Sequence, residues 1–154
     1  MVSKAHPSIH RNPERCSGCR LCELVCSARK NPGMTNPKKS RIQIDIEHRE
    51  NRNIPKVCIQ CDPHPCFEAC PAGAISLQGF QGIPIVDLET CTGCEACVQA
   101  CPYGFIFFDP EGKIALKCDL CGGDPECVKN CLQGAIVFHE ASQKKEEKGK
   151  EEER

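Results

Sequence analysis

The chain packs four cysteines into eleven residues in the stretch Cys91-Thr92-Gly93-Cys94-Glu95-Ala96-Cys97-Val98-Gln99-Ala100-Cys101-Pro102. The same arrangement occurs four times. Each set keeps two residues between its first two cysteines and three between its last two, and only the middle gap changes. The sets are Cys16, Cys19, Cys22, Cys26; Cys58, Cys61, Cys66, Cys70; Cys91, Cys94, Cys97, Cys101; and Cys118, Cys121, Cys127, Cys131. Variation confined to one loop position indicates that one structural unit was repeated.

The composition excludes a conventional globular core. The 154 residues include sixteen cysteines, no tryptophan, one tyrosine and 12 each of glycine and proline, and the hydrophobic fraction of 40% counts the cysteines. So few large apolar side chains do not offset the entropy of ordering a loop-rich chain. Cross-links or metals must hold the fold, which leaves disulfide scaffolds, metal-sulfur proteins and zinc arrays.

The sequence favours metal binding over disulfides. The first residues contain no apolar run of the kind that signals export, and no later stretch approaches the roughly 18 apolar residues of a membrane span. We therefore expect a soluble, cytoplasmic chain that neither inserts into a membrane nor binds nucleic acid. In a reducing cytoplasm sixteen thiols do not persist as disulfides, so a metal is the expected partner.

Short β-prone runs flank the cysteine sets. They follow the fourth cysteine of three sets at residues 74–77, 105–108 and 135–138, and precede the third and fourth sets at 83–87 and 113–116. These runs predict short antiparallel ribbons, and residues 41–47 alternate like a half-buried strand. The three-residue spacer between the last two cysteines of a set suits one helical turn. The predicted class is α+β, with short strands, short helices and many loops.

The stretch 91–102 matches the bacterial ferredoxin signature C-x2-C-x2-C-x3-C-P, in which three cysteines hold one [4Fe-4S] cube and the fourth ligates a neighbouring cube. The second set also ends in a cysteine followed by proline, at Cys70-Pro71, so it is the natural mate of the third set. The first and last sets then pair with each other. Sixteen ligands supply four [4Fe-4S] clusters with none left over. Zinc sites favour two well-separated C-x2-C pairs, whereas each set here spans 11 to 14 residues.

Exchange of the fourth cysteine predicts four ligand sets. They are Cys16, Cys19 and Cys22 with Cys131; Cys118, Cys121 and Cys127 with Cys26; Cys58, Cys61 and Cys66 with Cys101; and Cys91, Cys94 and Cys97 with Cys70. No nucleotide-binding, hydrolase or metalloprotease motif is present, and no cysteine is spare for nucleophilic catalysis. We therefore expect a non-catalytic protein.

Other residues receive structural interpretations. His64 lies inside a cysteine loop, but four cysteines already serve each cube, so we expect it to donate a hydrogen bond or occupy a turn. Four aromatic residues are expected to pack around a cluster rather than conduct electrons: Tyr103, Phe105, Phe107 and Phe108. Three basic residues are expected in a solvated loop: Lys38, Lys39 and Arg41. Residues 140–154 are expected to form a solvated, charged tail.

The four-set pattern resembles the iron-sulfur electron-transfer subunits of the dimethyl sulfoxide reductase, formate hydrogenlyase and carbon monoxide dehydrogenase type, over about residues 14–139. The stretch C-R-L-C-E-L-V-C-S and the later N-P-K-K-S-R-I resemble the compact members that accompany carbon monoxide dehydrogenases, hydrogenases and tungsten aldehyde oxidoreductases. The resemblance implies a tandem bacterial-ferredoxin-like fold. Its outer half comprises residues 14–57 plus 110–139, and its inner half 58–109.

The resemblance also implies a role. We expect an electron-transfer subunit of an anaerobic redox complex, with the outer half against a larger catalytic subunit and the inner half toward a second redox partner. The expected catalytic subunit is a molybdenum- or tungsten-pterin oxidoreductase of the aldehyde type. The alternatives are a hydrogenase, a carbon monoxide dehydrogenase, a free-standing polyferredoxin that shuttles between enzymes, and a zinc-bound interaction module.

Overall fold

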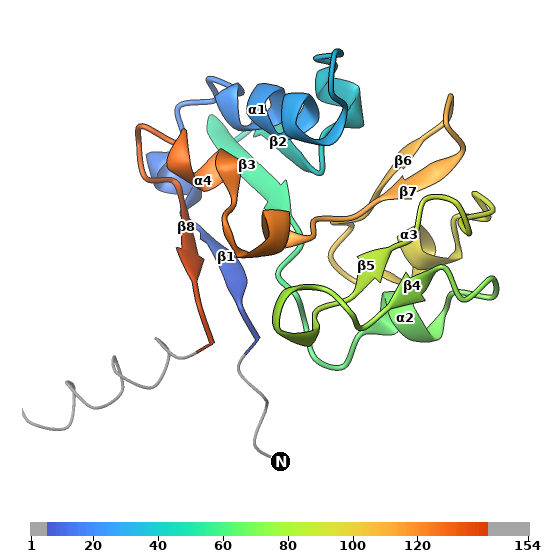
Figure 1. Cartoon of the computed structure of the whole chain (residues 1–154). Coiled ribbons are helices and arrows are strands. Elements are labelled where there is room, and N and C mark those ends of the chain that lie inside the picture. The colour runs from blue at the N-terminus through green and yellow to red at the C-terminus, as the bar shows by residue number, and fades with distance from the viewer. Residues whose placement is uncertain (1–5, 142–154) are drawn as a thin grey trace, which may run out of the picture.

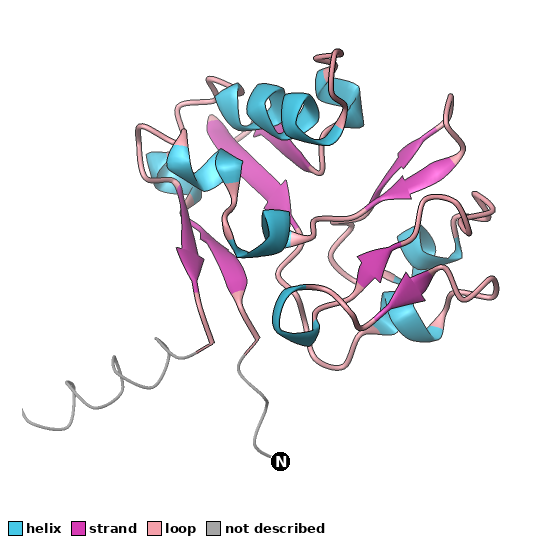
Figure 2. Cartoon of the chain, viewed as in Figure 1, coloured by secondary structure: helices cyan, strands magenta, loops and turns pink. Residues whose placement is uncertain are grey.

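The computed structural model describes residues 6–141, so nearly all of the predicted charged tail at 140–154 lies outside the described residues. Loops and turns connect every regular element and make up much of the chain (Figure 2). Within the described range, no helix combines the length and apolar character that a bilayer span requires. The class is α+β and loop-rich, as the sequence predicts.

Four antiparallel ribbons of two strands each form the β-structure (Figure 1). They are β1 (Ser8–Arg11) with β8 (Ile136–His139), β2 (Ile42–Glu47) with β3 (Arg52–Val57), β4 (Ile75–Ser76) with β5 (Ile85–Val86), and β6 (Phe107–Asp109) with β7 (Ile114–Leu116). The α-helices are α1 (Leu21–Lys30), α2 (Pro65–Glu68), α3 (Ala96–Ala100) and α4 (Glu126–Lys129). Single 3-10 turns lie at Pro13–Arg15, Pro37–Lys39, Phe80–Gly82 and Leu120–Gly123.

The elements gather into two groups (Figure 1). One group joins the two ends of the described chain: β1 pairs with β8, α1 packs against α4, and the ribbon β2–β3 lies beside α1. The other group contains α2, α3, β4 and β5. The hairpin β6–β7 spans residue 110, and Ala115 of β7 packs with the core of the second group.

Cysteines supply much of the buried core of each group. The first core contains Ile9, Cys26, Ile42, Val57, Cys58, Ile83, Cys118, Leu120, Cys127 and Ile136, and the second contains Cys66, Ile75, Cys97, Ile106 and Ala115. Ile83 lies in the predicted inner half, residues 58–109, yet it packs in the first core. The two groups therefore share an apolar contact, and the cysteine side chains occupy positions that large apolar residues fill in most domains.

The sequence predicts the strands next to the cysteine sets and the strand at residues 41–47, and it misses two others. Strands occur within or overlapping all the predicted runs, and the spacer of the third set lies in α3. Strands β1 and β3 were not predicted, because β1 has only four residues and β3 contains Pro55, which an edge strand tolerates. Helix α1 extends past Cys26 to Lys30, whereas the helices of the other three sets end before the fourth cysteine.

Candidate metal centres

Four hollows in the structure are each lined by four cysteines. The Cys16 quartet comprises Cys16, Cys19, Cys22 and Cys131; the Cys26 quartet comprises Cys26, Cys118, Cys121 and Cys127. The Cys58 quartet comprises Cys58, Cys61, Cys66 and Cys101; the Cys70 quartet comprises Cys70, Cys91, Cys94 and Cys97. In every quartet three cysteines come from one sequence set and the fourth from another. All sixteen are free thiols.

Among residues 6–141, no group of three or more His, Cys, Asp or Glu side chains is arranged to hold a single metal ion. The four thiols on each hollow are the donor set that a [4Fe-4S] cluster uses.

Left-handed backbone in the cysteine loops turns the sulfur atoms inward. Gly93, between the first two cysteines of the third set, has a φ of 70°. A Cβ atom there would collide with the backbone oxygen of Lys113. Gly18 holds the same place in the first set with a φ of 72°, and a Cβ there would lie 2.7 Å from Asn53 Oδ1. A side chain at Gly93 would meet backbone that cannot move aside, so that position requires glycine, whereas the same place in the second and fourth sets carries a positive φ at Gln60 and Leu120.

The fourth cysteine of every set accepts a backbone hydrogen bond at sulfur. In three sets the donor is the N–H four residues later: Ala74 to Cys70 at 3.3 Å, Phe105 to Cys101 at 3.4 Å and Ala135 to Cys131 at 3.3 Å. In the first set α1 continues past this point, and Cys26 instead accepts from Arg41 N at 3.3 Å. Hydrogen bonds to sulfur stabilise thiolates and help to set cluster potentials.

Burial opposes ionisation of the thiols that lie deepest. Burial, reinforced by the charge of Glu23, raises the pKa of Cys22 to about 12. It likewise raises the pKa of Cys66 to about 11 and that of Cys118 to about 12, and it raises the pKa of Cys127. These groups are therefore neutral thiols at neutral pH. A metal that binds them as thiolates must displace their protons and supply the compensating positive charge.

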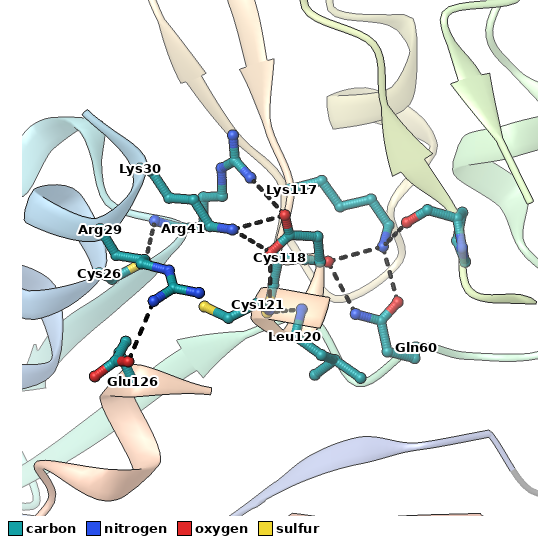
Figure 3. Close-up of polar contacts among 12 residues, drawn as sticks. Cys26, Arg29, Lys30, Arg41, Gln60, Lys117, Cys118, Leu120, Cys121 and Glu126 are labelled. Atoms are coloured by element: carbon teal, nitrogen blue, oxygen red, sulfur yellow. Dashed lines mark hydrogen bonds and ion pairs between the residues drawn. The ribbon is translucent and has the colours of Figure 1, made fainter. Parts of the chain in front are cut away.

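An ion-pair network lies beside the Cys26 quartet (Figure 3). Asp119 binds Lys30 at 2.6 Å and Arg41 at 3.2 Å, and its Oδ1 accepts a hydrogen bond from Cys121 N at 3.0 Å. Burial alone would raise the pKa of Asp119, but Lys30 and Arg41 hold that pKa below its ordinary value. The network balances two cations with one carboxylate.

The solvated-loop prediction for the basic group is wrong for two of its residues. The side chain of Arg41 is only 13% exposed and binds Asp119, while Lys39 forms ion pairs with Asp109 and Glu111 of the β6–β7 hairpin. These acidic partners stand far along the chain from the basic residues that they bind. Such pairs leave no local signal in a sequence.

Lys117 was not singled out by sequence reasoning, yet it is almost completely buried, at 2% exposure. Its Nζ donates to Gln60 Oε1 at 2.8 Å, to Pro84 O at 2.7 Å and to Cys118 O at 3.2 Å (Figure 3). Gln60 is buried as well. The polar contact thus lies where the two groups of elements meet.

His64 lies in the loop between Cys61 and Cys66, and two of the four aromatic residues line the hollow of the Cys58 quartet. His64 occupies the residue before α2 and packs edge-on against His6, with ring centroids 5.1 Å apart. Its Nδ1 is buried without a hydrogen bond. Phe105 is buried and stacks on Tyr103 at 5.6 Å, and both line the hollow. Tyr103 itself is half-exposed.

Comparison with known families identifies two matches in this chain. Residues 49–141 match the 4Fe-4S dicluster domain, and residues 13–29 match the 4Fe-4S binding domain. Together these matches include all sixteen cysteines.

Individual relatives are subunits of oxidoreductases. The chain is 45% identical over 120 residues to the polyferredoxin-like subunit of an aliphatic sulfonate oxidoreductase from Pyrococcus furiosus, covering 77% of this chain and 68% of the relative. It is 36% identical over 135 residues to a subunit of the tetrathionate reductase from Salmonella typhimurium, covering 80% of this chain and 54% of the relative. The chain therefore spans between about half and two thirds of the length of these relatives.

Among solved structures, the fold is similar to that of a chain in the BamBC active-site complex of benzoyl coenzyme A reductase. The TM-score is 0.52 at 26% sequence identity, and the match covers 86% of this chain and 75% of the other.

Proposed function

This chain belongs to the 4Fe-4S dicluster domain family, and on that premise we propose that its four quartets hold a row of [4Fe-4S] clusters along which electrons pass between two redox partners. The chain is an iron-sulfur electron-transfer protein and not itself a catalyst. One observation carries the proposal: each of four separate hollows is lined by four cysteines, three from one set and one from another. The clusters supply one-electron chemistry, and the protein spaces and shields them.

Shared elements support a fixed order of the quartets. Helix α1 carries Cys22 of the Cys16 quartet and Cys26 of the next, so it joins these two. Helix α2 contains Cys66 of the Cys58 quartet and is followed by Cys70 of the last. Cys58 packs in one core with members of the Cys26 quartet and links the middle pair. The order is then Cys16, Cys26, Cys58 and Cys70.

The two ends of this row reach the surface. Of the sixteen cysteines, all within the described residues, only Cys19 and Cys94 are exposed. Cys19 belongs to the Cys16 quartet and Cys94 to the Cys70 quartet, the two ends of the row. Exposure at both ends and burial between them suit a relay in which electrons enter at one end and leave at the other.

We propose that the end near Cys19 contacts the larger catalytic subunit. The hollow of the Cys16 quartet is lined by Leu21, Leu132 and Ile136, and Leu132 is 91% exposed. An exposed leucine beside a cluster ligand is suited to burial in an interface. The chain would divide into an outer half, residues 14–57 plus 110–139, and an inner half, residues 58–109, which faces the second partner. The charged tail, residues 140–154, has no role in these contacts.

The proposed catalytic partner is a molybdenum- or tungsten-pterin oxidoreductase of the aldehyde type. The relatives are subunits of sulfonate and tetrathionate oxidoreductases, which supports an oxidoreductase partner. The cytoplasm is the proposed location, because a reducing compartment favours cysteines that remain available to bind iron over cysteines paired in disulfides.

Anaerobically purified protein is expected to contain about sixteen iron atoms and about sixteen acid-labile sulfides per chain, four of each for every cube. Metal analysis and sulfide determination on one sample give both numbers. Brown absorbance that bleaches on reduction should accompany them. Stoichiometric zinc with little iron would contradict the proposal and favour the zinc-bound interaction module.

Purification of the tagged chain from its native cells, without oxygen, is expected to recover a much larger subunit that contains a pterin cofactor. A stable interface would bury more than about 1,000 Å² and survive gel filtration. Leu132→Asp should weaken this association and leave the iron content unchanged. Leu24→Asp, another exposed leucine on the first group, is the matched control. Recovery of a monomer that exchanges electrons with several unrelated enzymes would support the polyferredoxin instead.

A further inference from the structure

Lys117 is a buried cation without an acidic partner. Its three hydrogen-bond acceptors are an amide oxygen and two backbone carbonyl oxygens, all of them neutral. Across residues 6–141, no Asp or Glu forms an ion pair with it. Burying an ammonium group is costly unless a negative charge compensates it. The protein therefore leaves this charge to be balanced by something other than a carboxylate.

Gln60 fixes the lysine at the junction between two quartets. Its Oε1 accepts from Lys117, its Nε2 donates to Cys118 O at 2.9 Å, and its backbone N–H donates to Cys58 Sγ at 3.5 Å. One residue thereby contacts a ligand of the Cys26 quartet and a ligand of the Cys58 quartet. The ammonium cannot turn away to solvent while these bonds hold it.

Lys117 lies beside ligands of both quartets. Its Nζ donates to the backbone oxygen of Cys118 in the Cys26 quartet, and Gln60, which it also binds, donates from its backbone N–H to Cys58 Sγ in the Cys58 quartet. The other cations beside the Cys26 quartet, Lys30 and Arg41, bind Asp119 and are partly neutralised by it. Lys117, by contrast, has no carboxylate among the partners that hold its Nζ at this junction (Figure 3).

We propose that Lys117 is the counter-charge shared by the clusters of the Cys26 and Cys58 quartets, and that it favours the reduced state of both. A cube with four thiolates carries −2 when oxidised and −3 when reduced. A fixed positive charge stabilises the more negative state, and the low dielectric of a buried site strengthens the attraction. The inference rests on the proposed function because it requires clusters in these two quartets.

Reduction potentials measured by an EPR-monitored redox titration test this role. Lys117→Met removes the charge and keeps an unbranched side chain of similar length. Gln60→Glu keeps the lysine but places a carboxylate against its Nζ. Each variant is expected to lower the reduction equilibrium constant of two of the four clusters by about tenfold, which corresponds to about 59 mV for one electron. The other two clusters should keep their potentials.

Two further variants separate charge from structure. Lys117→Arg retains the charge and should restore most of the wild-type potentials. Lys56→Met removes a partly exposed lysine that pairs with Asp45 on the β2–β3 ribbon, and it should move none of them. Iron content is measured first for every variant.

The possible outcomes are distinct. Unchanged potentials in a Lys117→Met or Gln60→Glu protein that retains about sixteen iron atoms would overturn the inference. So would an equal shift of all four clusters, or loss of iron from both variants, because the residue would then serve assembly rather than tuning. Wild-type protein without about sixteen iron atoms would instead overturn the proposed function.

Discussion

Cys131→Ser is expected to remove the cluster of the Cys16 quartet, although its other three ligands lie near the opposite end of the chain. The structure places Cys131 on the same hollow as Cys16, Cys19 and Cys22. Serine is a much poorer ligand for iron than a thiolate, so the cube should be lost or strongly labilised. The iron content should fall from about sixteen to about twelve atoms per chain.

Double variants separate the exchanged ligation from its alternative, in which each sequence set closes on its own cube. Combined Cys16→Ser and Cys131→Ser should remove one cube and leave about twelve iron atoms, because both residues serve the same quartet. Combined Cys118→Ser and Cys131→Ser should remove two and leave about eight. The reverse pattern would contradict the exchange. Ser17→Ala, in the same loop but without a thiol, is the matched control and should retain about sixteen.

Removal of iron is expected to unfold the chain and not to leave a compact apoprotein. Cysteines form part of both buried cores, which contain Cys26, Cys58, Cys66, Cys97, Cys118 and Cys127, with others packed against them. The β-structure of the described residues consists only of two-stranded ribbons, which are marginal by themselves. Without clusters, the hollows would leave these elements with few contacts. Metal binding then supplies the free energy of folding.

Far-UV circular dichroism and gel filtration, measured during anaerobic chelation with a thiol reductant present, test this expectation. Secondary structure should disappear in step with iron, and the hydrodynamic radius should rise. The reductant prevents disulfides from confusing the result. A control with chelator already saturated by iron should retain the native spectrum. An iron-free chain that keeps a compact radius and a cooperative urea transition would contradict the prediction.

The repeat explains why so much could be predicted from the sequence. Spacing predicts cofactor type and number, because three thiolates in a short loop and a fourth on the next helical turn match the geometry of neighbouring cubes. The same spacing predicts the turn in α3, and the β-prone runs that flank the cysteine sets predict the ribbons β4–β5 and β6–β7. The exchanged ligand sets remain a proposal, supported by the four cysteine-lined hollows.

Outside the repeated cysteine sets, local sequence patterns do not predict which strands pair or which charged residues meet. The pairing of β1 with β8 joins the two ends of the described chain. The run that forms β8 is predicted, but β1 has no distinctive composition and nothing local marks it as the partner of β8. The sequence around Arg41 is typical of a solvated residue. In the fold, Arg41 binds Asp119, which lies 78 positions away along the chain. Ion pairs of this kind depend on tertiary proximity, which residue spacing does not encode.

The sequence alone determines that this is a multi-cluster iron-sulfur protein, because thiolate ligation is a local property of short cysteine loops. Only the tertiary structure decides which charges act on which quartet. Lys117 and Gln60 are 57 positions apart, and nothing in the residues around either one marks it as buried or paired. Folding brings them together between two quartets. Because the lysine is removed from water there, its charge interacts more strongly with neighbouring charges.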